Sequence, residues 1–436
     1  MQTRRTALGL GLTLPGLAAL AACGPNTGGA GGSGNGDGGG SGSLRFTWWG
    51  NPARNERTQN VIAAFNEEVN SDLTISEEPG DWGSYWDRLA TQVAGGDAPD
   101  IIQMDEKFIS EYGNRGVLLD LHEAGLDTSN FASGTVEVGE LPDHGLVAVN
   151  AGINAPALLA NPEVFEQAGV EIPDDASWTW DELIEVAKEV QANSDSGIVG
   201  ATQLGLQQMI CQLFLRQQGQ DQFDDGQVGF DAETAVSFYE FAKKLQDESA
   251  GPEAALAVED SGSSLDQSLF ATGRAGLGVA WANQLVAYDE ALGGNLVVLR
   301  PPSMAGNVAD AQLWFKASML WSVSANTADP EGAVQFIDFM VNNPEAGRIL
   351  GVERGVPANT EVREAAEPEL DESAMKVVDY LDLIEPDLGE VAPIVPQGGG
   401  EFEDILQRTM EPVLFGNQTP EQGAEALFNE INSAVV

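Results

Sequence analysis

Two hydrophobic patterns alternate along the first part of the chain, and this alternation constrains the fold more than any other feature. Five segments carry the alternation: a β-rich run at 44–49, a helical stripe at 57–68, a short alternating run at 73–77, an amphipathic stretch at 84–94 and an apolar run at 100–104. The order strand, helix, strand, helix, strand predicts a parallel sheet covered by helices. We therefore expect an α/β fold.

Polar and aromatic side chains follow the expected strands where a ligand would reach them. In open sheets of this kind, ligands lie beyond the carboxyl ends of the strands. Trp49 and Asn51 end the first strand, Asp105 ends the third, and Trp82 precedes the second helix. Aromatic faces beside carboxylates and amides suit a sugar, which offers an apolar C–H face and hydroxyl groups. We expect at least one of Trp49 and Asp105 to touch ligand.

A purely structural alternative exists for the same residues. Trp48 and Trp49 could both be core, and Asp105 could cap a helix. Strand alternation in any case directs one of the two tryptophans into the core.

Residues 1–23 have the form of an export signal. Arg4 and Arg5 precede an apolar run, Ala7 to Ala22, whose 16 residues include Pro15. A spanning helix needs about 20 apolar residues, so we interpret this segment as a signal peptide. The arginine pair is similar to a twin-arginine signal but lacks the usual Phe and Lys after it, so that route and ordinary secretion both stay open.

Cys23 follows Leu20-Ala21-Ala22 and resembles the lipobox cysteine of bacterial lipoproteins. In that class the sulfur receives a diacylglycerol; the alternative is an unmodified thiol in a discarded leader. Residues 24–43 are almost all Gly, Ser, Asn and Asp, which predicts a flexible tether of roughly 25 Å root-mean-square length. We expect a folded body held by a lipid on the outer face of the cell membrane.

The charge of the body excludes several partners. The 23-residue leader contains two of the 20 basic residues and none of the 68 acidic ones, so the remainder has a net charge of −50. Such a surface repels nucleic acid and anionic lipid. We expect no nucleic-acid partner and attachment to the membrane through the lipid alone, for which two acyl chains are sufficient.

Length and residue usage set further limits. About 390 residues follow the tether, which favours two lobes over one core. Cys211 is the only other cysteine, so lipidation of Cys23 leaves no disulfide within the chain. His122 and His144 have no Cys or His at ligand spacing, which argues against a metal site of that kind. We expect no cofactor and a monomer.

Catalytic signatures are missing from the sequence. The 68 acidic residues form pairs everywhere by chance, and none is marked as a glycosidase pair. There is no Gly-x-Ser-x-Gly elbow and no phosphate loop. We therefore predict that the protein is not an enzyme, with a secreted carbohydrate-active hydrolase or a passive surface adhesin as alternatives.

Several longer motifs resemble one family, the extracellular solute-binding proteins of bacterial sugar ABC importers, the group that contains maltose-binding protein. Besides the leader and tether they include LRFTWWG at 44–50, TQVAGGDAPDIIQMD at 91–105, LLANPEVFEQAG at 158–169, FATGRAGLGVAWAN at 270–283 and NTADPEGAVQFIDFM at 326–340. The resemblance implies a protein that captures a sugar and delivers it to a membrane permease, with the ATPase among its partners.

The same resemblance implies two α/β lobes. Each lobe is expected to hold a mostly parallel sheet flanked by helices, with a ligand cleft and a hinge between the lobes. The lobes would be 44–158 plus 319–358 and 159–318 plus 359–436.

Trp281 is the residue that the resemblance places in the cleft as a sugar-stacking tryptophan. The full set of candidate ligand residues is Trp49, Asn51, Arg54, Trp82, Asp105, Asn154, Gln208, Trp281, Asn283 and Trp314. Core packing is the alternative for Trp281, and a solvated helix face is the alternative for Gln208. Arg354 is expected at the surface or in a salt bridge of its lobe.

The chain departs from the family pattern in two places. Lys316-Ala317-Ser318 replaces the usual Gly-Gly before the returning strand. The aromatic of the C-terminal cleft segment is present only as Phe402. These departures leave the identity of the sugar open.

Overall fold

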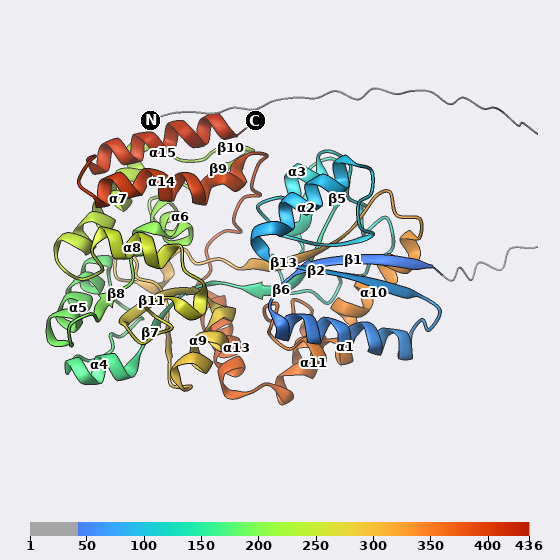
Figure 1. Ribbon diagram of the computed structural model, residues 1–436, viewed down its shortest axis with the longest axis horizontal. Helices are drawn as coiled ribbons and strands as arrows, with labels where there is room; N and C mark the ends of the chain where they lie inside the picture. The colour runs from blue at the N-terminus through green and yellow to red at the C-terminus, as the bar shows by residue number, and fades with distance from the viewer. Residues whose placement is uncertain (1–41, 436) are drawn as a thin grey trace, which may run out of the picture. The chain divides into compact units, whose positions relative to one another are not determined.

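Two β-sheets organise the computed structural model, which describes residues 42–435 (Figure 1). The strand order is β2-β1-β3-β13-β6 in the first sheet and β12-β7-β11-β8 in the second. We call each sheet with its helices a lobe. The signal peptide, Cys23 and most of the tether lie outside the described residues.

The predicted strand–helix alternation is confirmed in the first lobe. The five elements are β1 (Ser43–Trp49), α1 (Pro52–Glu68), β2 (Thr74–Gly80), α2 (Trp82–Ala94) and β3 (Ile101–Met104), and the three strands pair in parallel. Helix α1 begins earlier than the hydrophobic stripe indicated. The reason is local: Pro52 occupies the first turn and the Asn51 side chain accepts a hydrogen bond from the Arg54 backbone N–H.

The expectation of mostly parallel sheets is wrong for the other strands. In the first sheet β13 (Lys316–Val323) runs antiparallel to β3 and to β6 (Val149–Asn154). In the second sheet β7 (Pro156–Ala160) runs antiparallel to β11 (Ala275–Trp281) and β12 (Val297–Leu299), and only β8 (Val199–Ala201) is parallel to β11. Strand β13 enters the first sheet from the second lobe, at the edge where β3 ends, so it must run in the opposite direction.

Helices cover both sheets. Around the first sheet lie α1, α2, α3 (Ile109–Gly113), α10 (Pro330–Asn342), α11 (Pro344–Leu350) and α12 (Thr360–Ala366), with a small hairpin of β4 (Glu140–Leu141) and β5 (Gly145–Leu146). Around the second lie α4 (Pro162–Ala168), α5 (Trp180–Asn193), α6 (Gln208–Arg216), α7 (Ala232–Asp247), α8 (Ala254–Ser261), α9 (Leu285–Leu292), α13 (Glu372–Ile384), α14 (Phe402–Leu414) and α15 (Pro420–Ala434), with a hairpin of β9 (Phe223–Asp224) and β10 (Gln227–Val228). Among the described helices, none is long and apolar enough to cross a membrane.

Three hydrophobic clusters fill the space between sheets and helices. One belongs to the second lobe and two cover the opposite faces of the first sheet. Trp48 packs beside Phe46 on one face and Trp49 packs against Tyr85 on the other. The expectation that one of these tryptophans enters the core is confirmed for Trp48, and Trp49 is buried as well.

The first connection between the two sheets is a single residue long, whereas the return connection runs from Leu299 to Lys316. Strand β6 ends at Asn154 in the first sheet, and β7 begins at Pro156 in the second. The return crossing ends where β13 begins at Lys316. The lobe limits expected from the sequence stay a prediction.

Candidate functional site

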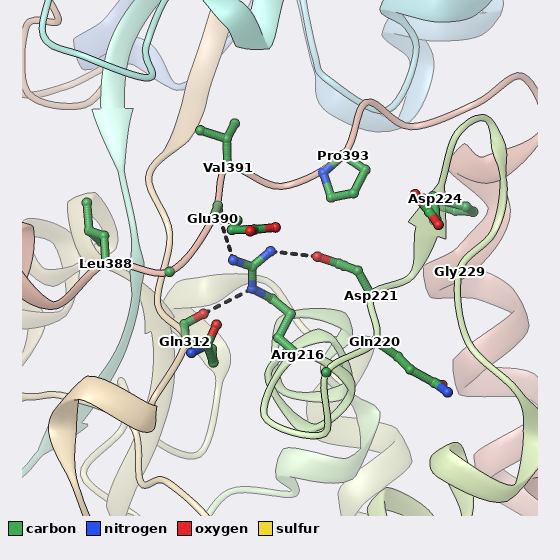
Figure 2. Close-up of a pocket in the computed structure, with 13 residues that line it drawn as sticks. Arg216, Gln220, Asp221, Asp224, Gly229, Gln312, Leu388, Glu390, Val391 and Pro393 are labelled. Atoms are coloured by element: carbon green, nitrogen blue, oxygen red, sulfur yellow. Dashed lines mark hydrogen bonds and ion pairs between the residues drawn. The ribbon is translucent and has the colours of Figure 1, made fainter.

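Two adjoining hollows, one between the lobes and one beside it on the second lobe, together form what we call the cleft. The narrow hollow has a volume of about 40 Å³, and its wall comes from both lobes, with Glu106 and Lys107 on one side and Gln208 and Trp314 on the other. The wide hollow, about 770 Å³, lies against the second lobe (Figure 2). Asp221, Phe223 and Pro393 line both hollows.

Residues 388–396, which we call the strap, form one wall of the cleft. In the second lobe, Arg216 donates from Nε to the Gln312 carbonyl at 3.0 Å and also binds the Glu390 carbonyl (Figure 2). Toward the first lobe, Ser110 Oγ donates to the carbonyl of Val395 at 2.5 Å. The strap therefore contacts both lobes.

Arg216 is itself held in place. Its Nη1 lies 2.6 Å from Asp221 Oδ2, and its guanidinium carbon lies 5.1 Å from the centre of the Trp314 ring. The side chain is buried, and the carboxylate of Asp221 balances its positive charge. Arg216 thus fixes the position of the strap.

Trp281 and Lys316 lie against each other beside the narrow hollow, and Lys316 lines it. Trp281, the last residue of β11, is half-buried, with its ring edge-on to Trp314 at 6.3 Å between centroids. The ammonium of Lys316 lies 4.6 Å from the centre of the Trp281 ring and donates to Glu106 Oε1 at 2.8 Å. The ammonium of Lys316 therefore makes a cation–π contact with the Trp281 indole and an ion pair with Glu106.

The charge of Lys316 is stabilised by its neighbours. Burial alone lowers the pKa of Lys316, but the carboxylates of Glu106, Asp105 and Glu403 outweigh this effect. The pKa of Lys316 is therefore raised above its ordinary value. The side chain is an ammonium at neutral pH.

The structure brings four of the predicted ligand residues to this region. Gln208 and Trp314 line the narrow hollow, and Trp281 lies against Lys316, which also lines it. Asp105 is buried just after β3 and accepts a hydrogen bond from the Lys107 backbone N–H.

Two other predicted residues lie at the crossing between the sheets. Asn154 Nδ2 donates to Asn283 Oδ1 at 2.8 Å, and the Asn283 backbone N–H donates back to Asn154 Oδ1 at 3.1 Å. Asn283 also reaches Ser318 Oγ at 3.4 Å. Their side chains thus tie β6, the end of β11 and β13 together.

The remaining four predicted residues lie in the first lobe, away from the lining of the cleft. Arg54 Nε lies 3.1 Å from Glu353 Oε1, and Asn51 Nδ2 donates to the same oxygen at 3.4 Å. Burial lowers the pKa of Arg54. Trp49, only 7% exposed, packs edge-on against Trp82, which is 44% exposed at the start of α2.

Two further expectations are affected by the structure. Arg354 is buried, and the prediction of a surface or salt-bridged residue is wrong: its guanidinium donates to Gln103 Oε1 at 3.0 Å and Thr58 Oγ1 at 2.8 Å. Burial lowers the pKa of Arg354 well below its usual value. Phe402, the aromatic of the C-terminal segment, is fully buried against Phe223.

Sequence reasoning missed several residues of the cleft. Lys316 was visible only as a departure from the family pattern, although its position at the start of the returning strand was the available signal. Lys107, whose Nζ lies 2.6 Å from Glu403 Oε2 across the lobes, directly follows a strand end that the sequence had marked. Arg216 and the strap gave no local signal, because their contacts join residues up to 285 positions apart.

A cleft at the junction of two α/β lobes that the chain crosses between more than once is typical of a protein that encloses a small solute. Residues 60–376 match the family described as bacterial extracellular solute-binding protein. The chain belongs to this family, which confirms the resemblance seen in the sequence.

Two curated relatives match over shorter stretches. An uncharacterized lipoprotein in the oleD 5' region of Streptomyces antibioticus is 27% identical over 32% of this chain and 32% of its own length. A probable amino-acid ABC transporter periplasmic-binding protein of Sinorhizobium fredii is 25% identical over 63% of this chain and 60% of its own. The matches thus span about a third and three fifths of these relatives.

Solved structures share the fold over nearly the whole chain. An extracellular solute-binding protein family 1 from Alicyclobacillus acidocaldarius is 25% identical, with a TM-score of 0.69 over 90% of this chain and 98% of that one. A periplasmic solute binding protein from Pectobacterium atrosepticum reaches a TM-score of 0.79 at 21% identity, over 91% and 100% of the two chains. An oligogalacturonide binding protein from Yersinia enterocolitica, in complex with saturated digalacturonic acid, reaches 0.78 at 20% identity, over 91% and 100%. The expected two-lobed fold is confirmed.

Replacing Trp281 tests whether its ring contacts solute. Stacking is worth about 0.5–1.5 kcal/mol beyond area burial, and the lost apolar area adds roughly 2–3 kcal/mol. Trp281→Ala should therefore weaken sugar binding by roughly 100-fold in calorimetry, at about 1.4 kcal/mol per tenfold.

Trp178 provides the matched control. It is buried in the second lobe, donates to the Arg300 carbonyl at 3.0 Å and does not line the cleft. Trp178→Ala should lower the melting temperature while the folded fraction keeps its affinity. If Trp281→Ala behaves like Trp178→Ala, Trp281 is a core residue that does not contact the solute.

Proposed function

We propose that this protein captures a sugar between its two lobes and delivers it to the permease of an ABC importer. The observation that carries the proposal is a cleft wall of amides, carboxylates and an ammonium, with the half-buried indole of Trp281 directly behind the ammonium of Lys316. An indole face suits the C–H surface of a pyranose, while Gln208, Glu106 and Lys316 offer partners for its hydroxyls. The family supports a binding protein rather than an enzyme.

The capture step uses the hinge. A solute that contacts both walls of the cleft stabilises the closed arrangement through contacts that an open arrangement cannot make. Two contacts already bridge the lobes: Lys107 of the first lobe pairs with Glu403 of the second, and Ser110 of the first lobe donates to the strap. The closed protein then offers both lobes together to the permease.

The chain would act at the outer face of the cell membrane. Cys23 follows a lipobox-like sequence, and the Streptomyces antibioticus relative is named a lipoprotein. We propose that Cys23 holds the lipid and that residues 24–43 form the tether of a monomeric body. With a net charge of −50, that body would have no nucleic-acid partner.

A thermal-shift screen of the mature protein tests the choice of solute. The library should contain neutral mono- and oligosaccharides, uronic acids, amino sugars and amino acids. A true ligand at about 100 times its Kd adds about 2.7 kcal/mol to the stability, which raises the melting temperature by at least about 3 °C. We expect such shifts from sugars; a response confined to amino acids would refute sugar capture and agree with the name of the Sinorhizobium fredii relative.

Replacement of Cys23 tests the anchor. Cys23→Ala removes the sulfur that would carry the lipid, so the protein should accumulate as precursor or appear in the medium. Cys211→Ala is the control, because Cys211 is buried and offers no thiol to a lipid. The measurement is detergent-phase partitioning of both variants, and partitioning of Cys23→Ala like the unmodified protein would contradict lipidation at this residue.

A further inference from the structure

We propose that Lys316 and Glu106 determine the charge specificity of the cleft, so that it binds solutes lacking a carboxylate and excludes their acidic counterparts. The inference rests on the proposed function, since it concerns the solute of the same site. It adds the class of sugar and the residues that select it. Four observations support it, namely the position of Lys316, its unused donors, the pairing of every cation of the cleft and the excess of carboxylates.

Lys316 occupies a fixed position. As the first residue of β13 it pairs with Asn154 across the sheet, and Asn154 is itself bonded to Asn283. Its side chain is 8% exposed and lines the narrow hollow beside Glu106. The ammonium is therefore presented to the cleft by rigid backbone rather than by a loop.

The ammonium of Lys316 does not use all of its hydrogen-bond donors. It carries three N–H groups, and within residues 42–435 it donates one hydrogen bond, to Glu106. Leaving buried donors without acceptors is costly. Hydroxyl oxygens of a solute that stacks near Trp281 can accept from these groups, while Glu106 can accept from solute hydroxyls in turn.

All three basic side chains that line the cleft are paired with carboxylates. The ion pairs are Lys316 with Glu106 at 2.8 Å, Lys107 with Glu403 at 2.6 Å and Arg216 with Asp221 at 2.6 Å. No cation of this set is left over for an acidic solute. A solute carboxylate could bind one of them only by displacing its present partner.

Further carboxylates face the same space. Asp224 and Glu390 line the wide hollow and Asp105 lies beside Lys316, and none of the three forms an ion pair within the described residues. Figure 2 shows the side chains of Asp224 and Glu390 at the wall of that hollow. Placing like charges together in an interface costs several kcal/mol, so the cleft repels an acid more than a neutral sugar of the same shape.

Matched sugar pairs provide the test. Glucose with glucuronate, galactose with galacturonate, and digalactose with digalacturonate differ mainly in the carboxylate. Calorimetry on the mature protein should find a neutral member that binds at least about tenfold more tightly than its acid, which corresponds to about 1.4 kcal/mol. Equal or tighter binding of the acid would overturn the proposal while leaving sugar capture intact.

Two variants assign the selection to the residues named. Glu106→Gln frees the ammonium from its carboxylate, so the neutral-to-acid affinity ratio should fall about tenfold, mainly through tighter binding of the acid. Lys316→Met removes the donor, so the neutral sugar should bind about tenfold more weakly. A purely structural role would change the melting temperature but not the affinity ratio.

Lys188→Met is the control for loss of one positive charge. Lys188 lies on α5 and pairs with Glu248, away from the cleft lining. This variant should leave both affinities unchanged. If Lys316→Met also leaves the neutral sugar within twofold, or Glu106→Gln leaves the ratio unchanged, the assignment to this pair is refuted. Failure of every sugar in the pairs and the screen would instead contradict sugar capture and this inference together.

Discussion

The reciprocal hydrogen bonds between Asn154 and Asn283 join the two halves of the molecule. They lie where β6 passes into β7 with a single residue between, and where β11 ends. A backbone hydrogen bond joins the same two segments, since the Ala282 N–H donates to the carbonyl of Ala155 at 2.9 Å. Each lobe has its own core, so the residues at this crossing control how the lobes approach one another. The crossing therefore joins two separately packed lobes beside the cleft.

Charge is the second constraint. A body of net charge −50 has few cations to place, yet three of them line the cleft, each against a carboxylate. Pairing a buried charge with an opposite charge offsets much of its desolvation penalty. Pairing leaves these side chains able to offer hydrogen bonds without offering net positive charge. The polar character of the cleft and its preference for uncharged solutes therefore have the same physical origin.

The parts that the sequence predicted well are those set by local pattern. The alternation over residues 44–104 predicted the parallel part of the first sheet, and the ends of β3 and β11 marked Asp105 and Trp281, which lie near Lys316 of the cleft lining. Pattern could not show that β13 and β7 run antiparallel to their neighbours, because strand direction there depends on crossings between lobes.

The candidate site was harder to predict because its contacts are distant in sequence. Arg54 is held by Glu353, 299 residues away, and Arg354 is buried on Gln103, 251 residues away. Trp49 enters an aromatic cluster with Trp82 instead of standing alone at a strand end. None of these partners leaves a periodic signal, so residue type alone could not show that these side chains pack within the first lobe.

The central claim is that solute closes the two lobes, and the distance between them is its most direct measure. Spin labels on Asp87→Cys in α2 and Glu425→Cys in α15 place one exposed probe on each lobe. Burial raises the pKa of the Cys211 thiol, so that residue stays unlabelled in the folded protein. Pulsed electron resonance should show that a saturating neutral sugar shortens and narrows the distance distribution. A sugar that binds in calorimetry but leaves this distribution unchanged would contradict capture by lobe closure.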